Sequence, residues 1–219
     1  MGTIKVVTLI NEALTILHDT GVRWPKTQVL EWFNNAQREV CLLKPEALAV
    51  NESFALTVGQ AKQTIPAGGI SLIEVVADLT TNKGIRITDR DTLDVHIPDW
   101  RSQTGDVEQY IYDLRDPKTF YVYPHAAAAK SVEIIYAKSP DQIVIADFDT
   151  DVQVIEVDDI YSNSIVNYIL HRAYIKDTKT ESQNKGVLFY KLFQESLGQK
   201  TNIDSMIHPK RMVKDSGGN

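Results

Sequence analysis

The hydrophobic pattern of this sequence changes its period twice, and this change most constrains the fold. Apolar residues first recur at every third or fourth position, from Ile4 to Leu43. From about residue 46 to 155 they occur in short runs rich in Val, Ile, Tyr, Phe and Thr, and from Asp158 to Leu197 the helical spacing returns. Spacings of three and four are typical of amphipathic helices, and short β-branched and aromatic runs are typical of strands. The pattern predicts helices at both ends with a β insertion between them.

The predicted helices at the two ends should pack together. Two are expected between residues 4 and 43, the second with Asn34 on its polar face, and two between 158 and 198, the last ending at Gly198. Their apolar faces are too wide to stay uncovered, so the two halves should bury each other. The predicted fold class is α+β: a four-helix bundle with an inserted antiparallel β domain of six to eight strands and an extended C-terminal tail. The expected domains are 1–45 with 156–198 for the bundle, 46–155 for the β domain and 199–219 for the C-terminal extension.

Charge and composition argue against several classes of function. The 219 residues carry a net charge of −6, from 29 acidic and 23 basic side chains. Non-specific DNA binding requires clustered Lys and Arg, so we do not expect it of the surface as a whole. We expect no secretion signal and no membrane span. The single cysteine, Cys41, lies in an apolar helical pattern and is predicted to pack in the core.

No motif for catalysis or for a cofactor is apparent. The sequence lacks a P-loop, a G-x-S-x-G elbow and a G-x-G-x-x-G turn, and none of its five histidines has another three or four positions away. Metal sites on helices commonly use such histidine pairs. We therefore predict a protein that is not an enzyme and holds no cofactor.

An acidic stretch between residues 141 and 159 contains seven carboxylates and no Lys or Arg. Asp147, Asp149, Asp151 and Asp158 have the spacing of an EF-hand loop, but Val152 stands where that loop requires glycine. The favoured interpretation is a solvated acidic segment that leads to a helix N-terminus, where carboxylates are stabilised. A calcium site and an acidic surface facing DNA or a basic partner are the alternatives.

Aromatic residues in the predicted strands leave open the alternative of a surface that binds ligands by ring stacking. An exposed row of these aromatic side chains could bind sugars or nucleic-acid bases by stacking, although alternation along a strand places about half of them in the core and no basic cluster lies beside them. The residues concerned are Tyr110, Tyr112, Phe120, Tyr121, Tyr123 and Tyr136.

Short motifs over residues 3–200 resemble, in their order and spacing, the head-to-tail adaptor proteins of short-tailed phages. They are Leu17-His18-Asp19, Arg23-Trp24, Leu30-x-Trp32-x-Asn34-x-Ala36-Gln37-Arg38-Glu39, Gln63-x-Ile65-Pro66, Asp89-Arg90, Pro98-Asp99-Trp100, Asp116-Pro117-x-Thr119-Phe120-Tyr121-Val122-Tyr123-Pro124, Tyr168-Ile169-Leu170-x-Arg172-Ala173-Tyr174-x-Lys176-Asp177 and Phe193-x-x-x-Leu197-Gly198. The motif residues are interpreted as packing and turn positions, with Trp24, Trp32 and Trp100 as buried anchors.

The resemblance implies a non-enzymatic virion protein at the head-tail interface, assembled in the host cytoplasm. Such adaptors form a ring, commonly of twelve copies, that extends the DNA channel for genome ejection. The implied partners are the portal protein, the next tail or nozzle protein, other copies of the chain and DNA that passes without specific binding, but no membrane. Another tail tube or nozzle component and a glycan-binding or glycan-cleaving tail protein are the alternative functions.

The resemblance also implies that the C-terminal extension docks on the portal. Residues 199–219 contain four basic and two acidic side chains, a local charge of 4 − 2 = +2. We predict a segment that is disordered alone and folds against the portal or a neighbouring subunit, with a frayed terminus as the alternative. The residues expected to make this contact are Lys200, Ile203, Met206, Ile207, Lys210, Arg211 and Met212.

Overall fold

The computed structural model describes residues 2–177 and 179–207, with side chains as far as residue 198. The chain divides into two compact units. The helical unit comprises residues 1–44 and 140–219, and the β unit comprises residues 45–139. The α+β fold class predicted from the sequence is confirmed.

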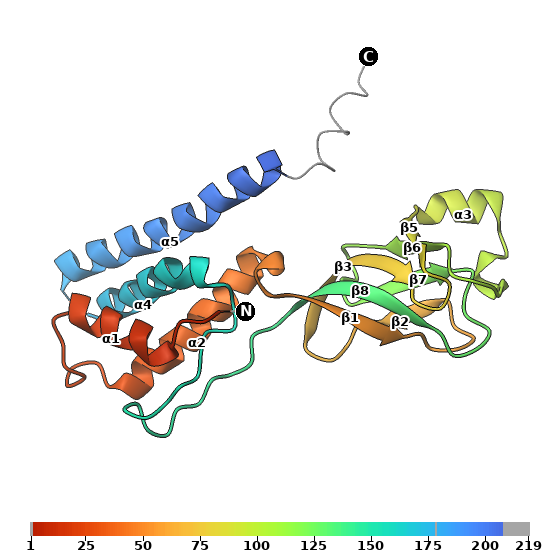
Figure 1. The fold of residues 1–219 in the computed structure, drawn as a ribbon. Coiled ribbons are helices and arrows are strands. Elements are labelled where there is room, and N and C mark those ends of the chain that lie inside the picture. The colour runs from red at the N-terminus through yellow and green to blue at the C-terminus, as the bar shows by residue number, and fades with distance from the viewer. Residues whose placement is uncertain (1, 178, 208–219) are drawn as a thin grey trace, which may run out of the picture. The chain divides into compact units, whose positions relative to one another are not determined.

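The helical unit has helix α4 at its centre (Figure 1). Helix α4 contacts α1, α2 and α5, and α1 also contacts α2. Seven of the residues in α4 are buried, among them Ile165, Ile169 and Leu170, because this helix is covered on several sides. Trp24 and Trp32 are buried in this unit, as predicted. The helices are α1 (Val6–Ile16), α2 (Lys26–Leu43), α4 (Ser162–Lys176) and α5 (Thr180–Ile207).

Helix α5 is longer than the sequence predicted. It passes through Gly198, which was expected to end it, and continues to Ile207. A glycine inside a helix costs only about 1 kcal/mol relative to alanine, so one glycine does not stop a helix whose neighbours favour it. The first proline beyond Gly198 is Pro209. The prediction that an irregular tail begins at residue 199 is therefore wrong for residues 199–207.

The segment between residues 140 and 157 belongs to the helical unit, whereas the sequence suggested that the β insertion extends to residue 155. It forms no strand and makes one isolated bridge, between Lys5 and Val154. The side chains of Ile143, Ile145 and Ile155 are buried. Its Val and Ile residues look like a strand in sequence, but the isoleucines are buried in the helical unit without strand pairing, and Val144 and Val152 are exposed.

The β unit consists of two four-stranded sheets. The first has the order β1-β8-β3-β4 and the second β2-β7-β6-β5. All described pairings are antiparallel except that of β5 with β6, which is parallel. The strands are β1 (Ala49–Ala55), β2 (Lys62–Thr64), β3 (Gly69–Asp78), β4 (Lys83–Gly84), β5 (Arg86–Ile87), β6 (Gln109–Tyr112), β7 (Thr119–Tyr123) and β8 (Ser131–Lys138).

The two sheets share one core. Val75 and Ile134 from the first sheet cluster with Phe120 and Val122 from the second. A short helix, α3 (Arg90–His96), was not predicted, because only one of its seven residues, Leu93, is buried and the helical period is too short to recognise. Leu93 packs with Trp100, which is fully buried as expected.

Candidate interaction surfaces

The loop between α1 and α2 is fixed by residues of the adaptor-like motifs. The carboxylate of Asp19 accepts hydrogen bonds from the backbone NH groups of Val22, Arg23 and Trp24. Burial acts to raise the pKa of Asp19, but the backbone NH groups of Trp24, Arg23 and Val22 outweigh it and lower the pKa. This carboxylate therefore stays charged and holds the loop closed.

The same loop is tied to the turn between α4 and α5. Arg23 forms an ion pair with Asp177 at 3.0 Å, and Asp177 also accepts a hydrogen bond from Ser182. The Lys176 ammonium lies 5.5 Å from the centre of the Trp24 ring, which packs edge-on against Trp32. These motif residues thus contact each other and hold together the end of α1, the start of α2, the end of α4 and the start of α5.

The acidic segment, residues 141–159, uses several of its carboxylates to shape its own backbone. Asp147 accepts from the NH of Asp149 and from the hydroxyl of Thr150. Asp158 caps the short turn before α4 by accepting from the NH of Ile160. In the portion of the chain with described side chains, no three His, Cys, Asp or Glu residues are grouped to hold a metal ion.

Two buried amides of α2 hold this segment in place, and the sequence analysis missed them. Asn34 donates to the carbonyl of Ile143 at 2.9 Å and accepts from its NH at 3.0 Å. Gln37 accepts from the NH of Glu156 at 3.0 Å. Asn34 was expected on the polar face of its helix, yet it is only 5% exposed. Both amides adjoin the apolar positions Phe33 and Ala36, which is the one signal that could have indicated their burial.

Cys41 lies in the core of the helical unit, as predicted from the sequence. Its side chain is fully buried. Burial, with a smaller contribution from the charge of Glu156, raises the pKa of the thiol to about 11. A protonated and inaccessible thiol is a poor nucleophile, so Cys41 has a packing role.

The aromatic residues of the β unit do not form an exposed row. Tyr110, Phe120 and Tyr136 are buried. Tyr121 and Tyr123 are half-buried and meet the edge of Trp100 at ring-centre distances of 6.0 and 6.5 Å. The rings are therefore used mainly to stabilise the core, which removes the stacking surface on which the glycan-binding alternative depended.

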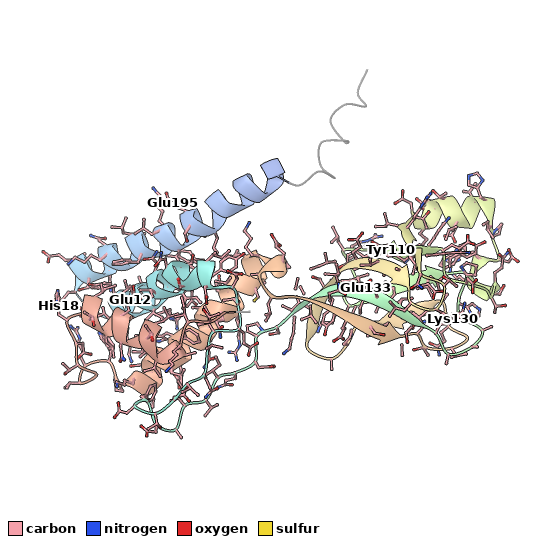
Figure 2. All side chains as sticks on the ribbon, in the orientation of Figure 1. Glu12, His18, Tyr110, Lys130, Glu133 and Glu195 are labelled. Atoms are coloured by element: carbon pink, nitrogen blue, oxygen red, sulfur yellow. The ribbon has the colours of Figure 1, made fainter. Side chains whose placement is uncertain are left out.

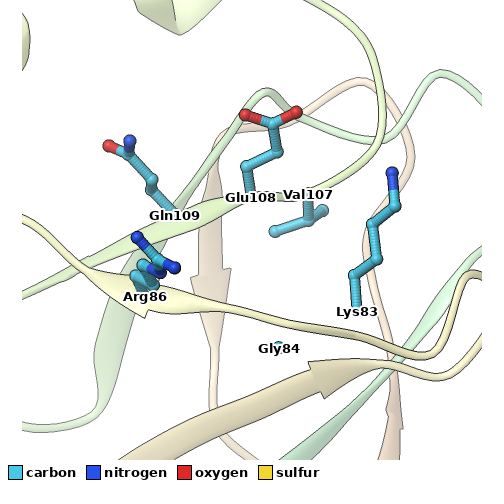
Figure 3. A pocket seen from close by; sticks show the side chains of 6 residues that line it. All are labelled: Lys83, Gly84, Arg86, Val107, Glu108 and Gln109. Atoms are coloured by element: carbon cyan, nitrogen blue, oxygen red, sulfur yellow. The ribbon is translucent and has the colours of Figure 1, made fainter.

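A small surface pocket lies between β4, β5 and the start of β6 (Figure 3). Its volume is about 220 Å³. Pockets that hold small molecules commonly measure about 300–1,000 Å³ and are mostly apolar. This one mixes opposite charges, and its size and lining do not indicate a ligand. The lining residues are Lys83, Gly84, Arg86, Val107, Glu108 and Gln109.

Helix α5 presents two different faces. One packs against α4: Phe193 and Leu197 are buried, and the hydroxyls of Ser164 and Ser196 lie 2.7 Å apart. The other, here called the outer face of α5, exposes apolar side chains between charged ones. Glu195 lies on it and points away from α4 (Figure 2). The outer face comprises Val187, Leu188, Lys191, Leu192 and Glu195, of which Val187 is 63% and Leu188 53% exposed. Lys191 pairs with Glu195 at 3.7 Å, whereas the Lys185 ammonium lies 5.9 Å from the centre of the Tyr174 ring of α4.

Helix α5 also continues beyond α4 (Figure 1). The contact of Ser164 with Ser196 places the start of α4 beside residue 196, and α5 runs on to Ile207. The positions of Lys200, Ile203, Met206 and Ile207 therefore fall on this extending part of the helix. Their side chains, and the whole of Lys210, Arg211 and Met212, lie outside the described residues.

Comparison with protein families gives a match over nearly the whole chain. The family model described as SU10 adaptor protein matches residues 4–212, which include both units. No match was found among curated proteins. Among the helices of the described chain, none has the length and apolar character to cross a membrane.

Proposed function

Because the chain belongs to the SU10 adaptor protein family, we propose that it is the adaptor that joins the portal of a tailed phage to the tail and extends the DNA channel. The family is one of structural phage proteins and is not a known enzyme family. The observation that carries the proposal is the family match across residues 4–212. The protein acts in the virion as a ring, with twelve copies as the expected number.

The geometry supports a mechanical role. Motif residues such as Asp19, Arg23 and Asp177 bind each other and stabilise the turns of the helical unit. We assign α1, α2, α4 and α5 to a four-helix bundle that forms the body of the ring, and the β unit to the contact with the next tail or nozzle protein. The contacts of α4 with the other three helices support the first assignment.

The C-terminal part of the chain is proposed to attach the adaptor to the portal. Helix α5 extends beyond α4, and the residues beyond it carry basic and apolar side chains on an acidic protein. Lys200, Ile203, Met206, Ile207, Lys210, Arg211 and Met212 are the proposed contact residues. A segment that orders on binding can reach across a subunit boundary and tie two proteins together.

Truncation tests this attachment. Deletion of residues 200–219 should abolish binding to the portal of the same phage, measured by co-sedimentation. The melting temperature should change little, because Leu197 is the last buried position described in α5. Leu114→Asp, at a position in the β unit that is 83% exposed, is the matched control and should bind normally. Full decoration of portals by the truncated protein would show that the C-terminal segment is only a frayed end.

A further inference from the structure

One lysine and two aspartates meet in the β unit, where β3 ends and β8 begins. Asp78 is the last residue of β3, Lys130 stands directly before β8 (Figure 2), and Asp106 lies in the loop that leads to β6. The ammonium nitrogen of Lys130 lies 3.9 Å from Oδ2 of Asp78, and it donates a hydrogen bond to Oδ1 of Asp106. One amine is therefore held between two carboxylates.

The carboxylate of Asp78 is fully buried, and its two oxygens have different surroundings. Oδ1 accepts hydrogen bonds from the backbone NH groups of Thr80, at 2.7 Å, and Thr81, at 3.2 Å. Oδ2 is shielded from solvent and accepts no hydrogen bond from the described residues. A buried charge with an unsatisfied oxygen is costly, and attraction to a buried partner often fails to repay that cost. A reaction that turned this ion pair into a neutral group would remove it.

The side chains around this cluster are apolar. Asp78 lies opposite Val132 in the pairing of β3 with β8, and Val132 is fully buried. Leu56 and Val107 are also buried in the same core, and the NH of Leu56 donates to the carbonyl of Lys130. The side chain of Lys130 is only 15% exposed. Bulk water is therefore largely kept from the amine and from the carboxyl beside it, which favours condensation of the two over hydrolysis.

The cluster contains the parts that acyl transfer requires. These are a nucleophile, a group that moves its protons and donors for the oxygen on which negative charge develops. The amine of Lys130 is the nucleophile, and the NH groups on Oδ1 of Asp78 are the donors. The hydrogen bond from Lys130 lowers the pKa of Asp106 below 3.8, so Asp106 is ionised and can accept a proton. Reacting groups held side by side avoid the cost of a bimolecular encounter.

We propose that Lys130 and Asp78 form an isopeptide bond within the β unit, with Asp106 transferring the protons. A bond forms between Nζ of Lys130 and Cγ of Asp78, and the bond from Cγ to Oδ2 breaks. Asp106 takes two protons in turn from Nζ and passes both to Oδ2, which leaves as water. One positive and one negative charge are lost together, and no oxidant or other reactant is consumed. The amide ties the end of β3 to the start of β8. This inference does not depend on the adaptor function.

Mass spectrometry of the full-length protein, unfolded in denaturant, tests the bond. The intact mass should be smaller than the mass expected from the sequence by one molecule of water. After digestion with trypsin, residues 63–83 and 119–138 should be recovered as one branched peptide that is not cleaved after Lys130. Fragmentation should place the branch at Asp78 and Lys130. Separate linear peptides with unchanged masses would show that the two side chains form only an ion pair, and would overturn the proposal.

Three variants assign the roles. Lys130→Arg keeps the positive charge but removes the amine, so the water loss and the branched peptide should disappear. Asp106→Asn should lower the linked fraction in freshly expressed protein at least about tenfold, because a positioned proton-transfer group contributes about 10²–10⁴ in rate. Lys83→Arg is the matched control. Lys83 lies opposite Asp78 in the pairing of β3 with β4, and this variant should stay fully linked.

Other results would overturn these roles. A branched peptide that persists in Lys130→Arg, or is lost in Lys83→Arg, would mean that another lysine is the nucleophile. Equal linkage in Asp106→Asn and the unaltered protein would overturn the role of Asp106. The bond itself is measured in the unaltered protein, so a variant that folds poorly does not remove the test.

Discussion

Asn34 is the residue that best explains why the acidic segment belongs to the helical unit. Its amide makes two hydrogen bonds to the backbone of Ile143 in a buried setting. A buried backbone group that loses its partner costs about 1–3 kcal/mol. No direct sign of this contact is visible in the sequence, because the partners are 109 positions apart and Asn is more often exposed than buried.

We expect Asn34→Ala to lower the free energy of unfolding by roughly 2–4 kcal/mol, because both the NH and the carbonyl of Ile143 lose their partner. Asn35→Ala is the matched control. Asn35 is half-buried and only accepts a long bond of 3.5 Å from Arg38, so its loss should change stability by less than about 0.5 kcal/mol. Urea denaturation measures both values. Equal stability of the two variants would contradict the assigned role of Asn34.

Asp159 should make the stability of the helical unit depend on pH. Hydrogen bonds from the Thr3 hydroxyl and the Thr3 backbone NH lower the pKa of Asp159 below its ordinary value of 3.8. A carboxyl whose pKa is lower in the folded state stabilises the protein above its unfolded pKa, and this contribution is lost as the pH falls through the folded pKa. Asp159→Asn should therefore lower the melting temperature at pH 7, and the difference from the unaltered protein should shrink below about pH 4. A difference that is constant with pH would contradict this.

At the scale of elements, the change of hydrophobic period predicted the helices at both ends and the short strands between them. Periodicity succeeds there because α4 and the strands bury regular faces. It failed where burial is not regular. Residues 140–157 bury isoleucines without forming a strand, α3 buries one residue, and α5 continues where a glycine suggested an end. The charges of the candidate contact surfaces could be read from the sequence. The exposed face of α5 could not, because it is defined by which side of α5 packs on α4.

Two glycines of α5 test whether this helix is continuous. A Cβ at Gly198 would meet no atom within 4 Å, so Gly198→Ala should raise the free energy of unfolding, by at most about 1 kcal/mol. A Cβ at Gly186 would lie 2.8 Å from Cγ1 and 3.1 Å from the backbone nitrogen of Ile175. Gly186→Ala should therefore destabilise the protein despite its better helix propensity. Thermal unfolding of both variants, compared with the unaltered protein, measures these effects. A loss of stability in Gly198→Ala would indicate that the helix ends at this glycine in a left-handed turn.

At the scale of the whole molecule, the boundary of the β unit decides which part of the chain folds alone. Replacing residues 45–139 by a short linker keeps the segment that Asn34 and Gln37 hold. This variant should retain helical circular dichroism and a cooperative melting transition. Replacing 46–155 instead removes Ile143, Ile145 and Ile155 from the helical core, and should lower the melting temperature or abolish the transition. Identical melting curves would contradict the assignment of residues 140–155 to the helical unit.

The proposed ring of this chain between portal and tail can be observed directly. Cryo-electron microscopy of the portal of the same phage, incubated with the full-length protein, tests it most directly. We expect a closed ring of copies in added density on the tail side of the portal, with a continuous channel and the C-terminal end of α5 directed at the portal. Portals without added density at saturating protein, or with the protein bound away from the channel axis, would contradict the account.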